Sequence, residues 1–581
     1  MPAIAKVNAY ANNEVGYLAW TLNGSIPGCL GFELTRIYVS DGDADSPAGT
    51  ERVLAAWVPF KGQQNPDWKP QTTAVWPVQK LTWRDLTARQ RRDRTELRSA
   101  NVTVKYRVRA LTRFRQGLVP VANVPERTYK GDPITLAYVD HGVESNEVTI
   151  TSRFGDLQAA FNNGILSTQW LKHAFEAQGE GPLTKDKLMA KLRMAGNAFR
   201  SYLTGDALPM LRQLIDRAAA ENGQVFMALY ELDDSELVDL IVANAQRVHL
   251  ILSNSSADRK TGEWDHGNVT QRARVRAANP AEMYDRMFNN RHIGHNKFVV
   301  YESAAGPQAV LTGSTNWTTN GLCAQSNNAL IIQNASVARQ YRAYWDALKQ
   351  DSATFTEPNP AGDGTANVQG KNLRTDDAIQ LAATTVSDVE VTPWRSPNTP
   401  QVTKGKRTPP DLAAVYSLMR KAKHAIFFAV FMPSVKGATS IVEEAINMGQ
   451  SDPSLLVYGS VSDPKVMPNY VAPQRNGDDD SESTDEKPKQ PATYDTQNVH
   501  VVRASALIQG DVVGDFEAEL LSARQCHHPR QDCRNRPAVA GLCSGDRQPQ
   551  SGLQGVLRER REPGDHAGQP KTGAGVHGSP P

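Results

Sequence analysis

The chain has 581 residues, 40% hydrophobic and 22% charged, a composition typical of a water-soluble globular protein with about three domains. Its 64 basic and 62 acidic side chains nearly balance, so the overall charge favours neither nucleic acid nor an anionic membrane as a partner. Residues 1–20 lack the regions of a secretory signal, and no apolar run approaches the about 18 residues of a membrane span. A cytoplasmic location is the default expectation. Five cysteines, an odd number, do not predict a disulfide framework.

The first 155 residues carry short segments in which apolar and polar residues alternate. Examples are GYLAWTL at 16–22, FELTRIYVS at 32–40 and VTVKYRVRA at 102–110. Clusters of Gly, Pro, Asn and Asp separate these segments. Alternation with a period of two is typical of strands that bury one face. We therefore predict an all-β sandwich over residues 1–155.

Residues 156–222 show a helical pattern, and we interpret 156–208 as a helical connector. From residue 209 to 350 the pattern indicates an α/β unit. Its strands are expected at VFMALYEL (225–232), VHLILSNSS (248–256), HNKFVVYE (295–302) and AVLTGSTN (309–316), with a helix at 234–245.

The same order of elements returns about 200 residues later, after a linker over 351–410 that is rich in Pro, Gly, Thr and Asn. A helix is predicted at 412–424, a strand at 425–433, a helix at 440–449 and a strand at 454–463. The acidic segment 476–489 is expected to be a solvated loop. The sequence thus predicts a second, truncated α/β unit over residues 411–523.

Polar side chains gather around the third and fourth strands of the first unit. His295 and Lys297 share one face of a strand, because side chains in a strand repeat every two residues. The turn after the next strand brings Ser314 and Asn316 to the same sheet edge if the two strands are neighbours. A base or nucleophile, a fixed positive charge and two hydrogen-bond donors are what a site needs to hold a phosphoryl group.

His295, Lys297, an acid after four intervening residues (Glu302) and the turn Gly-Ser-Thr-Asn at 313–316 together resemble the signature of the phospholipase D superfamily. This chain has Glu302 where the family has Asp. The resemblance covers about residues 209–523, and the N-terminal 155 residues lie outside it. It implies two α/β halves that each contribute one motif to a shared active site, with no metal and no cofactor.

The resemblance also implies a two-step mechanism. One histidine attacks phosphorus and forms a phosphohistidine, while the other protonates the leaving alcohol and then activates the incoming water or alcohol. Lys297 and Asn316, with their counterparts in the second motif, would neutralise the phosphoryl oxygens. In the family a carboxylate beyond the motif can orient the nucleophilic histidine. Asn327 either takes that position with its amide oxygen or is a buried asparagine at the start of a strand.

No second motif follows in the tail, residues 524–581, which is rich in Arg, Gln, Pro, Gly and His. One reading is a disordered basic tail. Another is a metal site, although the spacing fits no standard zinc pattern; its ligands would be Cys526, His527, His528, Cys533 and Cys543. A third is a shift of reading frame near residue 524. Read one nucleotide later, codons 525–536 are compatible with Asn-Ala-Ile-Ile-His-Asp-Lys-Ile-Val-Val-Ile-Asp, and codons 547–551 with Gly-Ser-His-Asn.

In that hidden frame the separation of His from Gly equals the separation of His295 from Gly313 in the visible one. We therefore expect residues 524–581 to be an out-of-frame, disordered tail that replaces the second motif.

The sequence predicts a phospholipase D-like hydrolase or phosphatidyltransferase that acts on a phospholipid, or on another phosphodiester, and is impaired by loss of the second motif. A nuclease of the same superfamily is the alternative. The balanced charge and the absence of an evident row of base-stacking residues weigh against it and against any stable nucleic-acid partner. A non-catalytic binding module is a third reading. A homodimer could bring two copies of the visible motif together.

Overall fold

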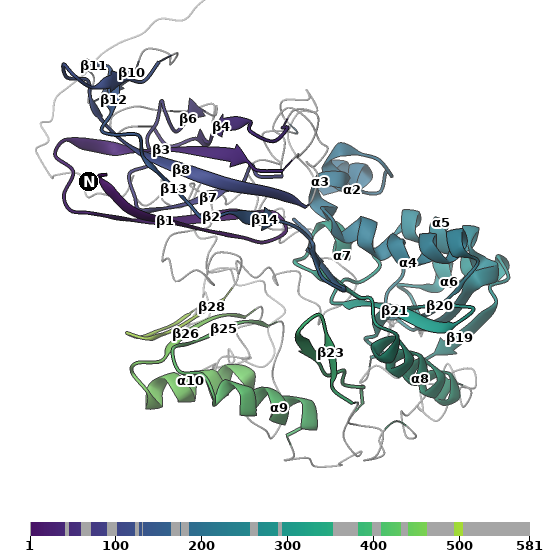
Figure 1. Ribbon diagram of the computed structural model, residues 1–581. Coiled ribbons are helices and arrows are strands. Elements are labelled where there is room, and N and C mark those ends of the chain that lie inside the picture. The colour runs from purple at the N-terminus through teal and green to yellow at the C-terminus, as the bar shows by residue number, and fades with distance from the viewer. Residues whose placement is uncertain are drawn as a thin grey trace, which may run out of the picture.

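The computed structural model describes residues 2–40, 46–59, 65, 71–89, 101–122, 127–129, 132–163, 175, 185–255, 265–288, 293–352, 373, 382–397, 408–430, 440–461 and 493–503. These residues form a β-rich region, an α/β unit with eight strands and a smaller α/β unit with four strands (Figure 1). The tail 524–581 and the acidic segment 476–489 lie outside the described residues. Among the described helices, none is long and apolar enough to cross a membrane.

The N-terminal region consists mainly of two antiparallel sheets. One has the order β1–β2–β7, formed by β1 (Ile4–Ala11), β2 (Gly16–Leu22) and β7 (Thr82–Asp85). The other has the path β4–β3–β8–β12–β9, with β13 and β14 also paired to β8. Its strands are β3 (Cys29–Tyr38), β4 (Glu51–Val53), β8 (Val102–Arg113), β9 (Val119–Pro120), β12 (Leu136–Tyr138), β13 (Val143–Glu144) and β14 (Val148–Ile150).

Alternating side chains of both sheets meet in one hydrophobic core. Leu18 from the first sheet and Leu34 and Tyr106 from the second are fully buried in this core. The strands predicted at 16–22, 32–40 and 102–110 are confirmed. Two further pairs of short strands complete the region: β5 (Ala55–Ala56) with β6 (Gln71–Thr72), and β10 (Arg127–Tyr129) with β11 (Asp132–Ile134).

The larger α/β unit is built on a sheet of eight strands in the order β15–β16–β22–β21–β20–β17–β18–β19. The strands β17, β18 and β19 run parallel, whereas all other neighbours are antiparallel. The strand bounds are β15 (Arg153–Phe154), β16 (Leu157–Phe161), β17 (Gln224–Leu229), β18 (Val248–Ser253), β19 (Glu282–Arg286), β20 (Lys297–Ser303), β21 (Gly306–Gly313) and β22 (Asn328–Ile332).

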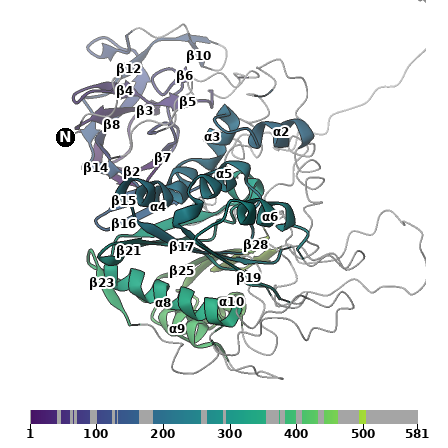
Figure 2. The ribbon, with the colours of Figure 1, turned by 90° about the vertical axis from the view of Figure 1, so that its right-hand side faces the viewer.

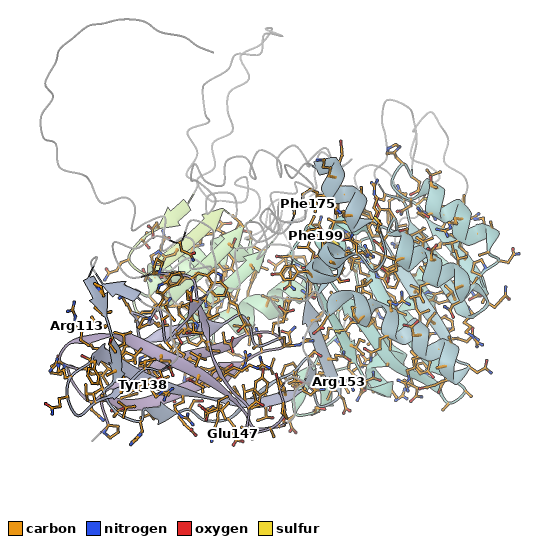
Figure 3. All side chains as sticks on the ribbon, turned by 90° about the horizontal axis from the view of Figure 1, so that it is seen from above. Arg113, Tyr138, Glu147, Arg153, Phe175 and Phe199 are labelled. Atoms are coloured by element: carbon orange, nitrogen blue, oxygen red, sulfur yellow. The ribbon has the colours of Figure 1, made fainter. Side chains whose placement is uncertain are left out.

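The interpretation of residues 156–222 as helix is wrong at its start, because Leu157–Phe161 forms the strand β16. Leu, Gln and Ala favour helix, but the backbone of this segment pairs with β22 in the sheet, and tertiary pairing overrides local propensity. Helices of the described part begin later, with α2 (Lys185–Leu192), α3 (Ala198–Thr204) and α4 (Ala207–Glu221). Figure 3 shows the buried Phe175 beside Phe199 of α3, with ring centroids 5.7 Å apart.

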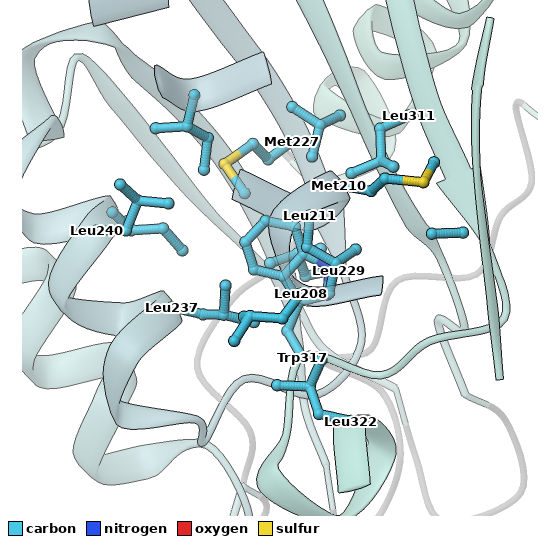
Figure 4. Close-up of a cluster of buried hydrophobic side chains, with 14 of the residues drawn as sticks. Leu208, Met210, Leu211, Met227, Leu229, Leu237, Leu240, Leu311, Trp317 and Leu322 are labelled. Atoms are coloured by element: carbon cyan, nitrogen blue, oxygen red, sulfur yellow. The ribbon is translucent and has the colours of Figure 1, made fainter. Parts of the chain in front are cut away.

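Helices cover both faces of this sheet (Figure 2). On one face lie α4 and α5 (Ser235–Ala243), whose leucines pack on Met227, Leu229 and Trp317 (Figure 4). On the other lies α8 (Ala335–Ser352), where Trp345 is fully buried and its indole Nε1 donates a 2.9 Å hydrogen bond to the carbonyl of Met227. The remaining helices are the 3-10 turn η1 (Ala245–Arg247), α6 (Val269–Ala277) and α7 (Thr319–Cys323).

A buried ionic contact joins the β-rich region to the larger α/β unit. Arg89 pairs with Asp206, which precedes α4, and also donates a 3.1 Å hydrogen bond to the carbonyl of Asn13. Glu14 lies beside this pair. Burial and the charge of Asp206 raise the pKa of Glu14 to about 7, although Arg89 opposes the shift. The contact therefore contains a carboxyl group that titrates near neutral pH.

The smaller α/β unit has the strand order β25–β26–β28–β27. Its elements are α9 (Pro410–Met419), β25 (Ala425–Val430), α10 (Ile441–Ser451), β26 (Leu456–Val461), β27 (Thr493–Asp495) and β28 (Val499–Arg503). A two-stranded sheet of β23 (Thr384–Val386) and β24 (Val389–Val391) precedes it. The helices predicted at 412–424 and 440–449 and the strands predicted at 425–433 and 454–463 are confirmed, with ends shifted by a few residues.

The parallel strands β25, β26 and β28 repeat the arrangement of β17, β18 and β19. Phe427 pairs with Tyr458 and Tyr458 with His500, just as Phe226 pairs with His249 and His249 with Glu282. In the smaller unit β28 therefore occupies the position that β19 has in the larger one.

Candidate active site

One edge of the eight-stranded sheet collects the polar side chains that the sequence singled out. The strands β20 and β17 are antiparallel, with Lys297 opposite Leu229, so the start of β20 lies beside the end of β17. The next strand, β21, runs back to this edge and ends at Gly313. His295, Lys297 and Asn316 therefore lie at the same edge of the sheet, at the carboxyl end of β17.

The imidazole of His295 stands edge-on against Tyr230, the residue directly after β17. Their ring centroids are 4.8 Å apart and their planes are inclined by 79°. As a whole residue His295 is exposed, whereas Tyr230 is buried. The dense protein around the ring and the charge of Lys297 lower the pKa of His295. The neutral imidazole, which is the nucleophilic form, is favoured.

Lys297 extends from the first residue of β20 over the face of Tyr230. Its ammonium lies 5.5 Å from the centre of that ring and donates a 3.2 Å hydrogen bond to the carbonyl of His295. Burial lowers the pKa of Lys297 to about 7, while the negative charge of Glu231 opposes the change. A nearby anion therefore stabilises the positive charge on Lys297.

Glu231 is a further acidic residue of the site, and the sequence did not reveal it. Its Oε2 accepts a 2.6 Å hydrogen bond from Nδ2 of Asn316, and its Oε1 accepts a 3.2 Å hydrogen bond from Oγ of Ser255. Burial raises the pKa of Glu231 to about 7, with the charge of Lys297 and the Ser255 hydrogen bond acting against the rise. The carboxyl group thus joins the ends of β17, β18 and β21.

Asn316 is 5% exposed and is held by its backbone neighbours as well as by Glu231. The next residue, Trp317, forms a bridge with Leu232 and donates a 3.2 Å hydrogen bond to the carbonyl of Glu231. The side-chain oxygen Oδ1 of Asn316 is buried and has no hydrogen-bond partner among the described residues. The site therefore contains an oriented amide with one unused polar atom.

Ser314 lies at the same edge but is tied to Asn327. Its Oγ donates a 3.0 Å hydrogen bond to Oδ1 of Asn327 and accepts a 3.0 Å hydrogen bond from the backbone of Asn328. The side-chain amide of Asn327 donates to the carbonyl of Gly321 at 2.8 Å. Within the described residues, Asn327 therefore orients Ser314 and forms no hydrogen bond with His295.

Glu302 does not lie with the other predicted residues. It stands at the far end of β20, opposite Gln224, the first residue of β17. There it forms an ion pair with Arg342 of α8, with 3.3 Å between Oε2 and Nε. Glu302 lies five positions beyond Lys297 along the extended strand, a span of about 17 Å. The prediction of Glu302 as a catalytic residue is corrected accordingly: its contact joins the sheet to α8.

The loops that support the site come from β18 and β19. Ser255 follows β18, and its backbone N–H donates a 3.0 Å hydrogen bond to Oδ1 of Asp265. Gly294 packs so closely that a Cβ placed there would come within 2.1 Å of Oγ of Ser253 and 2.8 Å of the ring of Phe288. The sequence reading missed Tyr230, Glu231, Ser255 and Asp265. The rule that sites form beyond the carboxyl ends of parallel strands would have pointed to the first three of these.

Among the described residues, no group of three or more His, Cys, Asp or Glu side chains is placed to hold a metal ion. The cysteines and histidines of the suggested metal site in the tail lie outside the described part.

Comparison with known proteins gives one family match. Residues 211–349 match the family model described as "Cardiolipin synthase, PLD-like domain". A search of curated proteins finds no match.

Several solved structures are similar to parts of the chain. The phospholipase D family member Nuc from Salmonella typhimurium aligns at 19% identity over 25% of this chain and 87% of its own, with a TM-score of 0.20. NucT from Helicobacter pylori aligns at 14% identity over 25% and 90%, with a TM-score of 0.20. Phosphatidylserine synthase from Haemophilus influenzae aligns at 13% identity over 45% of this chain and 60% of its own, with a TM-score of 0.30. The segment matched by the family model contains the whole motif from His295 to Asn316, and residues 211–349 belong to the phospholipase D superfamily.

Proposed function

We propose that this chain derives from a phospholipase D-like enzyme that cleaves or transfers a phosphodiester, with a phospholipid as substrate and His295 as the nucleophile. The observation that carries the proposal is the meeting of His295, Lys297 and Asn316 at one sheet edge. The neutral imidazole supplies a lone pair, and the ammonium and amide supply donors for the phosphoryl oxygens.

In the proposed first step, a ring nitrogen of His295 attacks phosphorus. A P–N bond forms while the P–O bond to the alcohol breaks, and the alkoxide takes a proton from a second acid. In the second step, water or another alcohol loses a proton to that same group and attacks phosphorus, which breaks the P–N bond and frees His295. Lys297 and Nδ2 of Asn316 would balance the charge on the non-bridging oxygens in both steps.

The second acid would come from a second motif. We propose that the β-rich region is a sandwich and that the smaller α/β unit is the second phospholipase D-like half, because β25, β26 and β28 repeat the order and register of β17, β18 and β19. Its own motif would follow β28, in the part of the chain where we propose a shifted reading frame. A homodimer that shares two copies of His295 is the other way to complete the site.

The decisive experiment compares this chain with the product of a gene from which one nucleotide has been deleted near codon 524. Both are assayed at equal concentration with a phosphatidyl substrate, bis(p-nitrophenyl) phosphate and single-stranded DNA, in the presence of a metal chelator. We expect only the repaired chain to act on the phosphatidyl substrate, and we expect His295→Ala in the repaired chain to abolish that activity. Equal activity of the original chain as a monomer would refute the half-site proposal, and cleavage of DNA alone would favour the nuclease.

A further inference from the structure

We propose that Glu231 is an internal counter-anion that occupies the phosphoryl site, and that a substrate phosphate enters only as Glu231 takes up a proton and Asn316 turns its amide. This inference rests on the proposed function, because it concerns the same phosphate-binding groups. It assigns to Glu231 a role in controlling access to the site.

The hydrogen bonds of the site show that Glu231 is already in the place of a ligand. Nδ2 of Asn316 is the donor that a phosphoryl oxygen needs, and Oε2 of Glu231 holds it at 2.6 Å. The ammonium of Lys297, the second group expected to bind phosphate, interacts electrostatically with the same carboxylate. A phosphodiester anion and an ionised Glu231 would therefore compete for one set of donors, and they would repel each other.

The unused oxygen of Asn316 indicates how the competition ends. Oδ1 is buried in a residue that is only 5% exposed, and within the described residues it has no partner. A buried oxygen without a hydrogen-bond partner destabilises this arrangement. If Glu231 is protonated, a half-turn of the Asn316 amide lets the carboxylic acid donate to Oδ1. The same turn releases Nδ2 from the carboxylate of Glu231, so that this donor becomes available to a phosphoryl oxygen.

The charges around Glu231 fit a carboxyl that gains a proton on ligand binding. Lys297 from β20 favours the ionised form, and the hydrogen bond from Ser255 after β18 acts in the same direction. Burial and the neighbouring carboxylate of Asp233 favour the protonated form, and they raise the pKa of Glu231 to about 7. Tyr230 also faces the group, with Asp265 and His295 nearby in the same edge. A second anion in the site would favour protonation of Glu231 further.

The test uses the full chain and dimethyl phosphate, a phosphodiester whose single negative charge does not change between pH 5 and pH 9. Difference infrared spectra at pH 8 should show the carbonyl stretch of a protonated carboxyl group when dimethyl phosphate is added. Glu231→Gln should lack this band, whereas the matched control Glu302→Gln should keep it. A band that persists in Glu231→Gln, or no band in a wild-type chain that binds the ligand, would overturn the proposal.

A second measurement removes the titration of Lys297. In Lys297→Arg the cation stays charged at every pH used, so the pH dependence that remains belongs to Glu231. Affinity for dimethyl phosphate, measured by phosphorus NMR, should fall about tenfold per pH unit above the pKa of Glu231. In the double variant Lys297→Arg with Glu231→Gln, this affinity should be independent of pH. If it still fell with pH as steeply as in Lys297→Arg alone, the inference would be contradicted. If neither Lys297→Ala nor Asn316→Ala binds dimethyl phosphate more weakly than the wild-type chain does, the proposed phosphate site itself is wrong.

Discussion

The side-chain amide of Asn316 donates a 2.6 Å hydrogen bond to Glu231, although 85 positions separate the two residues in the chain. Glu231 follows the parallel strand β17, and Asn316 follows the antiparallel strand β21, with β20 between them. The hydrogen bond therefore depends on the order of strands in the sheet. It places a carboxylate against the donor that the proposed chemistry requires.

Asn316→Asp should make the fold sensitive to alkaline pH. The substitution puts a second carboxylate against Glu231, and two carboxylates in one site raise the pKa of the pair. A carboxyl group whose pKa is raised in the folded state makes the protein less stable as pH rises above the ordinary pKa of that group, which is about 4.5 for a glutamate. We expect a loss of about 1–3 kcal/mol in the free energy of unfolding at pH 8, and almost none at pH 4, by urea denaturation.

The double exchange Glu231→Gln with Asn316→Asp is the control, because it restores one amide and one carboxyl group. Its stability at pH 8 should return toward that of the wild-type chain. A double variant as unstable as Asn316→Asp would show that the loss has another cause.

Gly294→Ala should displace the loop that carries His295. The added Cβ would lie 2.1 Å from Oγ of Ser253, so either the loop or the end of β18 must move. Overpacking of this kind costs about 1–3 kcal/mol. Binding of dimethyl phosphate should weaken at least about tenfold, because a small displacement of a site residue is enough to lose that much. Adding Ser253→Ala removes the closest atom and should recover part of both losses; no recovery would argue against this steric mechanism.

Glu302→Gln should leave the binding of dimethyl phosphate unchanged. The residue lies at the far end of β20, and its partner is Arg342, with side-chain exposures of 29% for Glu302 and 22% for Arg342. Partly exposed ion pairs contribute about 0.2–1 kcal/mol, so the melting temperature should fall only slightly. A tenfold loss of affinity for dimethyl phosphate in this variant would show that Glu302 does contribute to the functional site.

Glu14→Gln should stabilise the chain above neutral pH. The pKa of Glu14 is raised to about 7, so the folded state holds a proton that the unfolded state has already lost between about pH 4.5 and pH 7. The free energy of unfolding of the wild-type chain therefore falls as pH rises through this window, and Glu14 causes no further loss at higher pH. The variant should be more stable by on the order of 2 kcal/mol at pH 8 and no more stable at pH 4, by urea denaturation. Equal pH profiles for the two proteins would contradict the shift.

Sequence reasoning succeeded where one strand or one short connection decided the geometry. The two-residue repeat of a strand predicts His295 and Lys297 on one face; in the structure His295 lies just before β20, which begins at Lys297. Ser314 and Asn316 reach the same edge because β20 and β21 are neighbours. The same repeat, applied further, would have placed Glu302 on the opposite strand face and about 17 Å away. That error came from treating the family pattern as one site.

The parts that the sequence did not predict depend on long-range pairing. Glu231 enters the site only because β17 lies next to β20, more than 60 residues away in the chain. Residues 157–161 were taken for helix because Leu, Gln and Ala are good helix formers, and only the pairing with β22 makes them a strand. One of the two readings of Asn327 made it a partner of His295, whereas its side chain accepts a hydrogen bond from Ser314.

The outer edge of β25 has a consequence for how molecules of this protein meet one another. In the larger unit β17 lies between two strands, but among the described residues β25 pairs with β26 only, and Phe427 at its centre is 42% exposed. The backbone groups along such an edge are a template for a strand from another molecule. Self-association through β25 would grow with protein concentration and would not depend on phosphate or on His295, which makes light scattering against concentration a direct measure of how open that edge is.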